Sequence, residues 1–298
     1  MSQGWQDVAE KGASAGIALL VAVATGIGRR MARALLVPIA WWFVLLHADV
    51  RRASRDYLRR VLPGQVGVRE VYRHVRTFAE VALDRIYLVR GEIRRFRMSS
   101  TGEELVEALS RGGRGGILLL AHLGSYDGLR AWSSTRGIRV SAIGDFRNAR
   151  MFTAALRRMN PEVDVDLIQV EDDARFILSV AERVGQGGLV AVMGDRVAPG
   201  ERRVECDFLG GRAAFPAGPY LIAATLGCPI YLVYGLYREP NRYELHCEPF
   251  AERVELPRGE REEGLARLAQ RYATRLEQLC RQAPYNWFNF YDFWSVPR

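Results

Sequence analysis

A histidine and an aspartate five residues apart, His122 and Asp127, carry side chains suited to general-base chemistry. A neutral imidazole accepts a proton from a hydroxyl near pH 7, and a neighbouring carboxylate fixes its tautomer and stabilises the imidazolium that forms. Five residues along an undistorted helix place two side chains roughly 140° apart, so this pair cannot meet on one regular helix. We therefore expect His122 in a turn and Asp127 in the first turn of the helix that follows.

A structural interpretation of the same two residues stays open on spacing alone. In that interpretation His122 is an ordinary turn residue, and Asp127 stabilises the positive end of a helix dipole. The preceding residues, 117–121, form an uninterrupted apolar run, which is typical of a buried strand. In α/β proteins such a strand delivers the next residues to the sheet edge where ligands bind.

From residue 103 onward, the apolar pattern alternates between strand and helix in the manner of an α/β domain. Strands are predicted at 117–121, 139–143, 165–170, 189–193, 230–237 and 243–248, and helices at 103–110, 149–159, 173–184, 216–226 and 260–281, with a further helix after Gly124. We expect a mixed, mostly parallel sheet flanked by helices, with the site at the carboxyl ends of its strands.

Further polar residues follow predicted strands, as His122 does. Asp195 and Arg196 come directly after one strand, and Arg147 and Asn148 come after another. Arg196 is suited to hold an anionic phosphate or a thioester-carrier group, and Asp195 to position it. The structural alternative is that these are ordinary surface side chains.

Positive charge is concentrated in the first third of the chain. Residues 1–97 carry 17 Lys and Arg against 8 Asp and Glu, whereas residues 98–298 carry 25 against 26. An Arg-rich segment suits nucleic acid, an anionic membrane surface or an acidic protein. Its aromatic residues neighbour Leu, Val and Ile rather than polar base-reading side chains, which disfavours nucleic acid.

The same third contains two apolar stretches, 13–28 and 34–48, separated by arginines. Neither reaches the roughly 20 residues that cross a bilayer comfortably, but tryptophans such as Trp41 are typical of membrane interfaces. We expect residues 1–60 to form a membrane anchor with a basic flank, either one short span or a hairpin in the interface, and residues 61–298 to form the α/β domain. The alternative is a pair of buried core helices.

The four cysteines show no C-x-x-C spacing. They are expected to be reduced thiols of a cytosol-facing protein, with neither a disulfide framework nor a metal site.

The order of these features resembles the bacterial lauroyl/myristoyl acyltransferases of lipid A biosynthesis, within the wider His-x4-Asp/Glu acyltransferases. After the apolar and basic N-terminal segment, the resemblance is carried by residues 121–127 (AHLGSYD), 146–148 (FRN), 194–196 (GDR), 208–210 (FLG), 215–218 (FPAG) and 227–230 (GCPI). It extends over nearly the whole chain.

The resemblance implies a glycerophosphate acyltransferase-like fold. It also implies transfer of a fatty acyl chain from acyl carrier protein, or from coenzyme A, to a hydroxyl of a lipid at the cytoplasmic face of the inner membrane. His122 is then the base and Asp127 its partner. Substrate binding is expected at Arg147, Asn148, Asp195, Arg196 and Gly210. No metal or other cofactor is expected, because a thioester is already activated, and an acidic carrier and an anionic lipid suit the basic first third.

Three departures from the family pattern are visible. The family usually has Glu at the position of Asp127, so the reach is one methylene shorter. Ala217 replaces the Glu of related glycerophosphate acyltransferases, which argues against a glycerol-3-phosphate acceptor. Residues 284–294 (PYNWFNFYDFW) lack a basic tail and are similar to acyltransferase-like proteins of aryl polyene pathways, which favours a lipid other than lipid A.

Two functions of other classes remain as alternatives. One is a non-catalytic, membrane-bound partner of lipid or pigment assembly. The other is a thioesterase that uses water as the acceptor.

Overall fold

The computed structural model describes residues 24–113, 115–144, 166–170 and 174–294. In this part of the chain, a seven-stranded sheet has the order β1-β9-β8-β2-β5-β3-β4. Its strands are β1 (Arg97–Thr101), β2 (Gly116–Leu120), β3 (Val140–Gly144), β4 (Leu167–Gln169), β5 (Leu189–Met193), β8 (Ile230–Arg238) and β9 (Arg242–Ala251). Neighbouring strands pair in parallel, except for the antiparallel β8–β9 hairpin. The predicted mixed, mostly parallel sheet is confirmed.

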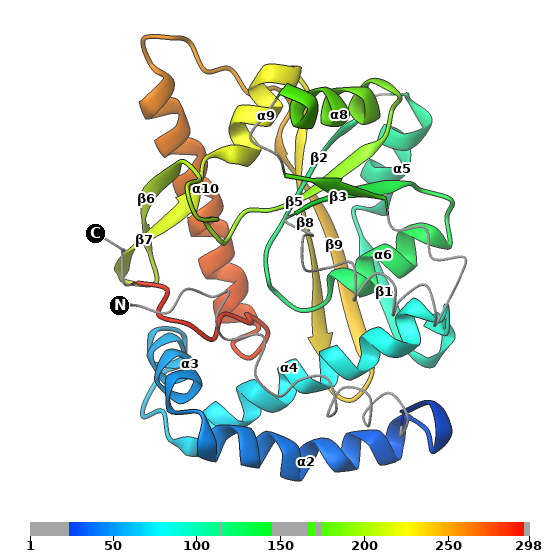
Figure 1. Cartoon of the computed structure of the whole chain (residues 1–298), viewed down its shortest axis with the longest axis vertical. Helices are drawn as coiled ribbons and strands as arrows, with labels where there is room; N and C mark the ends of the chain where they lie inside the picture. The colour runs from blue at the N-terminus through cyan, green and yellow to red at the C-terminus, as the bar shows by residue number, and fades with distance from the viewer. Residues whose placement is uncertain (1–23, 114, 145–165, 171–173, 295–298) are drawn as a thin grey trace.

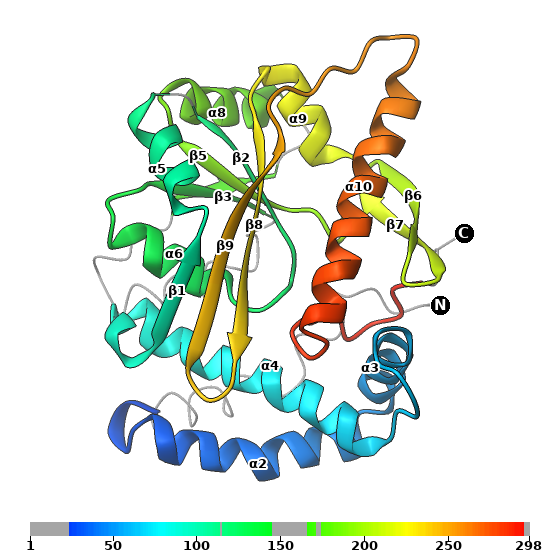
Figure 2. The same ribbon diagram turned by 180° about the vertical axis from the view of Figure 1, so that it is seen from behind.

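Helices flank this sheet, as predicted. They are α2 (Arg29–Leu46), α3 (Ala48–Val61), α4 (Val68–Val89), α5 (Glu103–Arg111), α6 (Tyr126–Ser134), α8 (Ala174–Gly185), α9 (Gly218–Leu226) and α10 (Arg261–Gln282), with a short 3-10 helix at Ile93–Arg95. Figures 1 and 2 show α2 and α4 side by side across one end of the molecule, with α8 and α9 at the other end. A small antiparallel hairpin, β6 (Arg203–Phe208) and β7 (Gly211–Pro216), packs against α10. The predicted helix at 149–159 lies outside the described residues.

Strand β2 is buried along its whole length because it lies between two parallel neighbours and has helices over both faces. Its side chains alternate between two hydrophobic clusters. Ile117 and Leu119 pack into the cluster that contains α10, and Leu118 and Leu120 pack into the cluster that contains α4 and α6. This burial explains the continuous apolar run that ends immediately before His122.

Helix α2 packs on α4 through buried small and apolar residues and through ion pairs. Arg29 Nε lies 2.7 Å from Asp84 Oδ1, and Arg33 Nη2 lies 2.8 Å from Glu80 Oε1. Both carboxylates are buried. Two of the arginines that separate the apolar stretches in the sequence, Arg29 and Arg33, therefore lie on the side of α2 that faces α4.

Among the described helices, none is by itself long and apolar enough to cross a bilayer. Helices α2 and α3 satisfy such a test only when taken together, and the chain bends by 97° between them. The boundary near residue 60 stays a prediction. Across it, Tyr57 packs on Trp287, with ring centroids 5.0 Å apart.

Candidate active site

The parallel register of β2 and β5 brings His122 and Asp195 together. Leu120 of β2 pairs with Met193 of β5, and the two polar residues each come two positions later. His122 Nδ1 lies 2.8 Å from Asp195 Oδ1, and the His122 main-chain N–H donates to Asp195 Oδ2 at 2.9 Å. Both residues therefore lie at the carboxyl edge of the sheet, where the site was expected.

Asp195 is fully buried and accepts further hydrogen bonds at Oδ2, from Trp287 Nε1 at 2.9 Å and from Asn289 Nδ2 at 3.2 Å. Burial by itself would raise the pKa of this carboxyl. The charge and hydrogen bonds of His122 outweigh that effect and bring the pKa of Asp195 well below its usual range. An ionised carboxylate only accepts hydrogen bonds, so Nδ1 of His122 is the donor and Nε2 is left as the basic nitrogen.

The carboxylate of Asp127 forms an ion pair with Arg85 and not with His122. Its Oδ2 is 2.6 Å from Arg85 Nε, in an ion pair that joins the first turn of α6 to α4. Burial would lower the pKa of Arg85, but the nearby Asp127 carboxylate more than reverses this and raises it. The expected pairing of His122 with Asp127 is therefore not the one observed. Ser125 caps α6, which packs against α4, whereas Asp195 follows β5, the strand adjacent to β2.

The turn between β2 and α6 is fixed on both sides, as expected for a turn that holds His122. Gly124 N donates to Asn286 O, and Ser125 N donates to Gly235 O of β8, both at 2.8 Å. Gly124 has φ of +65°, and a Cβ at this position would overlap the carbonyl of Gly235. The turn therefore requires glycine for its backbone conformation and for this close approach.

A short segment near the end of the chain, residues 286–289, completes the site, and we call it the C-terminal strap. Phe288 N donates to His122 O at 2.8 Å. Arg196 Nε donates to Asn289 Oδ1 at 2.7 Å, and its Nη2 donates to Phe288 O at 2.8 Å. Burial lowers the pKa of Arg196. The guanidinium expected to bind a substrate anion thus contacts the strap.

Of the remaining predicted site residues, Gly210 is the one that the structure describes. Gly210 lies in the turn between β6 and β7, and among the described residues no contact joins it to His122. Arg147 and Asn148 lie outside the described residues. The sequence reasoning missed Trp287 and Asn289. The signal that could have identified them is the presence of polar groups within the otherwise aromatic run at residues 284–294.

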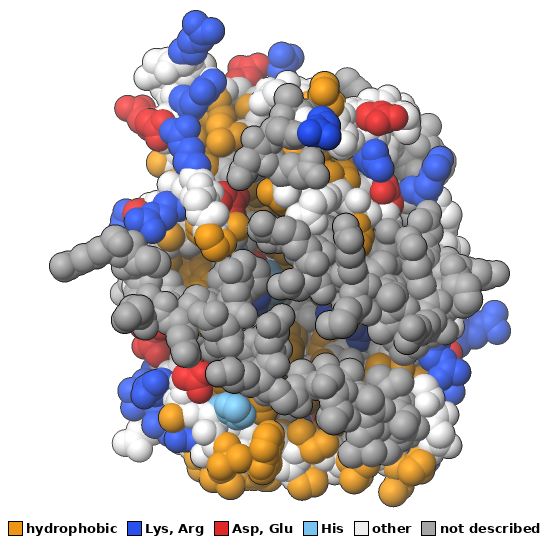
Figure 3. Space-filling view, viewed as in Figure 1, with side chains coloured by type: hydrophobic (Ala, Val, Ile, Leu, Met, Phe, Trp, Pro, Cys, Tyr) orange, Lys and Arg blue, Asp and Glu red, His pale blue; other side chains and the backbone are white. Residues whose placement is uncertain are grey.

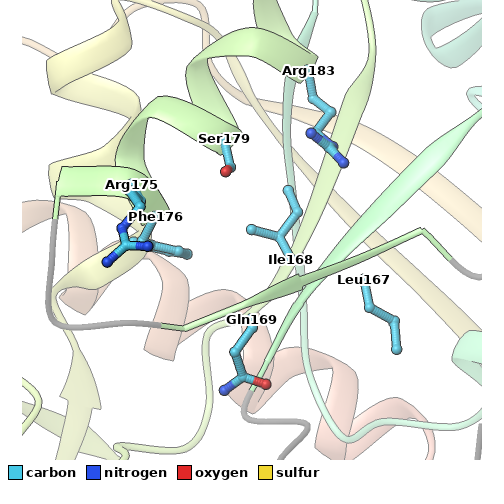
Figure 4. A pocket seen from close by; sticks show the side chains of 7 residues that line it. All are labelled: Leu167, Ile168, Gln169, Arg175, Phe176, Ser179 and Arg183. Atoms are coloured by element: carbon cyan, nitrogen blue, oxygen red, sulfur yellow. The ribbon is translucent and has the colours of Figure 1, made fainter.

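A separate groove lies between β4 and α8, lined by Leu167, Ile168, Gln169, Arg175, Phe176, Ser179 and Arg183 (Figure 4). Arg183 is paired at its rim with Asp166, at 3.1 Å. No contact within the described ranges links these side chains to His122. Nor do those ranges contain a group of three or more His, Cys, Asp or Glu that could hold a metal ion.

Comparison with known proteins agrees with the resemblance seen in the sequence. No curated protein matches the chain. Residues 6–295 match the family described as bacterial lipid A biosynthesis acyltransferase, and the match includes His122, Asp195 and the C-terminal strap. The chain therefore belongs to the bacterial lipid A biosynthesis acyltransferase family, which makes it an acyltransferase.

Proposed function

We propose that this acyltransferase moves a fatty acyl chain from a carrier thioester to a hydroxyl group of a membrane lipid, with His122 as the general base. The observation that carries the proposal is the bond between His122 Nδ1 and the buried carboxylate of Asp195. The imidazole is otherwise accessible, with 27% of its side chain exposed. An imidazole whose Nδ1 is held by a buried carboxylate, and whose side chain is partly open to solvent, is suited to take a proton from a bound alcohol through Nε2.

In this mechanism, Nε2 of His122 takes the proton of the acceptor hydroxyl as its oxygen attacks the thioester carbonyl carbon. The charge of Asp195 stabilises the imidazolium that forms. Collapse of the tetrahedral intermediate breaks the C–S bond, and the departing thiolate takes the proton from the imidazolium. The products are an ester and a free thiol, so His122 is returned to its neutral state.

We infer that the donor is acyl carrier protein or coenzyme A. A carrier protein of acidic composition is attracted to the Arg-rich first third of the chain, where residues 1–97 have an excess of nine positive charges. A thioester needs no further activation by a cofactor.

The acceptor is proposed to lie in the cytoplasmic leaflet of the inner membrane. The outward side of α2, with the residue before it, carries a continuous set of large apolar side chains, each at least 36% exposed, which we call the α2 apolar face. Its residues are Ile27, Met31, Leu35, Val37, Ile39, Trp41, Trp42, Leu45 and Leu46. Figure 3 shows hydrophobic side chains along this lower edge of the molecule. Such a face with interfacial tryptophans is suited to lie in a lipid surface.

The orientation of α4 links this face to the proposed base. On one side α4 holds α2 through Asp84 and Glu80, and on the other its Arg85 contacts Asp127 beside the site. Figure 1 shows α2 beyond α4 at this end of the sheet. We propose that the acceptor hydroxyl reaches His122 from this face of the molecule.

The family points to lipid A as the acceptor, while the aromatic C-terminal segment supports another lipid, such as a glycolipid or an aryl polyene lipid. A thioesterase would use the same His122 and Asp195 with water in place of the alcohol. The two reactions differ in product, because hydrolysis releases free fatty acid when no lipid is present.

Mass spectrometry of total lipids tests the proposal in cells fed labelled fatty acid. Cells expressing the native chain should contain a labelled lipid that is absent with His122→Ala and present with the control His246→Ala. The half-buried ring of His246, in β9, stacks on Tyr234 of β8. The lipid that disappears identifies the acceptor. Identical lipid profiles, with all three proteins folded and in the membrane fraction, would establish a non-catalytic partner instead.

A further inference from the structure

The C-terminal strap contributes more to the site than backbone packing. Trp287 and Asn289 are the only described side chains other than His122 that donate a hydrogen bond to the Asp195 carboxylate. We propose that Trp287 and Asn289 are positioning residues that hold Asp195 in the orientation in which it fixes the imidazole of His122. This inference rests on the proposed role of His122 as the base.

The hydrogen bonds of Asp195 divide unequally between its two oxygens. Oδ2 accepts from the main-chain N–H of His122, from the Trp287 indole and from the Asn289 amide, whereas Oδ1 accepts from His122 Nδ1. Three donors on one oxygen fix the plane of the carboxylate. The other oxygen is then aimed at the imidazole without competition from another described donor.

The amide of Asn289 has its orientation fixed by both of its neighbours. Its Oδ1 accepts from Arg196 Nε at 2.7 Å, and its Nδ2 donates to Asp195 Oδ2 at 3.2 Å. A guanidinium cannot accept a hydrogen bond and an ionised carboxylate cannot donate one, so rotating the amide by 180° would break both contacts. This gives Arg196 a role in the site as the group that orients Asn289.

Trp287 is immobilised on every side. Its indole is fully buried against Tyr57, Phe208 and Phe293, with ring centroids 4.8–5.3 Å apart. Its carbonyl oxygen lies 2.8 Å from Nε2 of the buried His74. The indole N–H therefore reaches Asp195 from a rigid support, which is what a positioning group requires.

The test compares two tryptophans of the same C-terminal segment. Trp287→Phe keeps an aromatic ring and removes the N–H that reaches Asp195. Trp294→Phe removes an N–H that donates to the carbonyl of Phe208, away from the site, at 3.0 Å. Turnover is measured with the full-length chain in vesicles of bacterial total lipid extract, with labelled lauroyl–acyl carrier protein as donor. We expect kcat to fall about 10- to 100-fold in Trp287→Phe, with KM unchanged, and to stay near the native value in Trp294→Phe.

A second readout needs no substrate. Diethyl pyrocarbonate modifies the neutral imidazole, and peptide mass spectrometry follows His122 separately from the other histidines. Without the indole donor, Asp195 is no longer held toward Nδ1 of His122, so the protonated ring loses part of the stabilisation that the carboxylate gives it. The midpoint of modification should therefore move to lower pH by about 0.5 unit in Trp287→Phe, and should not move in Trp294→Phe.

The two readouts separate the possible failures. If Trp287→Phe loses activity without a shift in the midpoint, or behaves like Trp294→Phe in both measurements, the positioning role is overturned. If Trp287→Phe does not fold, as judged by its thermal melt, Asn289→Leu replaces it and is expected to show the same fall in kcat and the same shift of the midpoint to lower pH. If His122→Ala retains transfer, the proposed base is wrong, while the modification midpoint still reports whether Trp287 holds Asp195.

Discussion

Asp195 receives two hydrogen bonds from the single residue His122, one from its main-chain N–H at 2.9 Å and one from its ring at 2.8 Å. Because one residue supplies both donors, the backbone at the end of β2 sets the position of the carboxylate and of the imidazole together. Asp127, the acid closer in sequence, is instead bonded to Arg85. The two carboxylates therefore have different surroundings, and substitutions should separate their roles.

Replacing Asp195 with Asn should lower kcat about 100-fold or more while the protein stays folded. An amide carries no charge to stabilise the imidazolium, and its NH2 group can donate to Nδ1 and so favour the wrong tautomer of His122. The measurement is the rate of labelled acyl transfer at saturating donor, with circular dichroism as the check on folding. Turnover within threefold of the native rate would exclude Asp195 as the orienting carboxylate.

Asp127→Asn should act mainly through the loss of its ion pair with Arg85. We expect Asp127→Asn and Arg85→Gln to lower the free energy of unfolding by similar amounts, on the order of 1–3 kcal/mol. The double variant should be hardly less stable than either single variant, because all three lack the same interaction. Urea unfolding of the native chain, the two single variants and the double variant provides the double-mutant cycle. If Asp127→Asn alone abolishes turnover and Arg85→Gln does not, Asp127 acts on His122 rather than on α4.

The parts of the fold that could be predicted are those in which burial produces a simple pattern of apolar residues in the sequence. Strand β2 is apolar throughout because both of its faces are covered. Strand β1 (Arg97–Thr101) was not predicted, because it is an edge strand with polar residues at exposed positions. Helix α4 was also missed, since its inner side carries Glu80 and Asp84, whose arginine partners lie on α2. Buried ion pairs interrupt the apolar period from which a helix is recognised.

The candidate site likewise has a part that the sequence predicts and a part that it does not. His122 and Asp195 could be found because each follows a predicted strand, but their pairing depends on the β2–β5 register, which the sequence does not state. Local spacing instead pointed to Asp127. Trp287 reaches Asp195 only because the chain returns to the site after α10, and such a long-range contact has no local signal.

Leu45→Glu should weaken binding to lipid vesicles. Leu45 is 65% exposed on the α2 apolar face, so its substitution does not disturb the core but places a charge where the lipid surface is proposed to lie. The control is Leu178→Glu on α8, at the opposite end of the molecule, where the side chain is 64% exposed. Flotation with vesicles containing anionic lipid measures binding. Equal loss of binding in the two variants, or none in either, would argue against α2 as the membrane-binding surface.

Gly124→Ala should destabilise the protein more than Gly137→Ala, although the two glycines have similar φ angles of +65° and +68°. At Gly137 no atom lies within 4 Å of an added Cβ, so the cost is that of the left-handed conformation, about 1 kcal/mol. At Gly124 the methyl group would also overlap the carbonyl of Gly235, and the backbone next to His122 must shift. We expect a larger loss of stability and a fall in kcat for Gly124→Ala alone, measured by thermal melts and acyl transfer. Similar effects of the two substitutions would mean that the close approach to β8 is not required.

His74 should make the protein less stable in mild acid. It is fully buried between Ser54 and the carbonyl of Trp287, and burial lowers its pKa from 6.5 to about 4. Above pH 6.5 His74 is neutral in the folded and the unfolded chain. As the pH falls from 6.5 toward 4, the unfolded chain takes up a proton that folded His74 does not, so stability is lost over this window, on the order of 3 kcal/mol in total.

His74→Gln isolates this effect, because glutamine can still donate to the carbonyl of Trp287 but does not titrate. The substitution lowers stability at pH 7.5 through imperfect packing, so the quantity to compare is the slope of unfolding free energy against pH, measured by urea unfolding between pH 7.5 and 4.5. The native chain should lose stability more steeply than His74→Gln below pH 6.5. Parallel curves would show that His74 takes its proton in the folded protein as readily as in the unfolded one. In that case the contact between His74 and Trp287 would not hold a neutral ring, and the support of the C-terminal strap from α4 would be weaker than the geometry indicates.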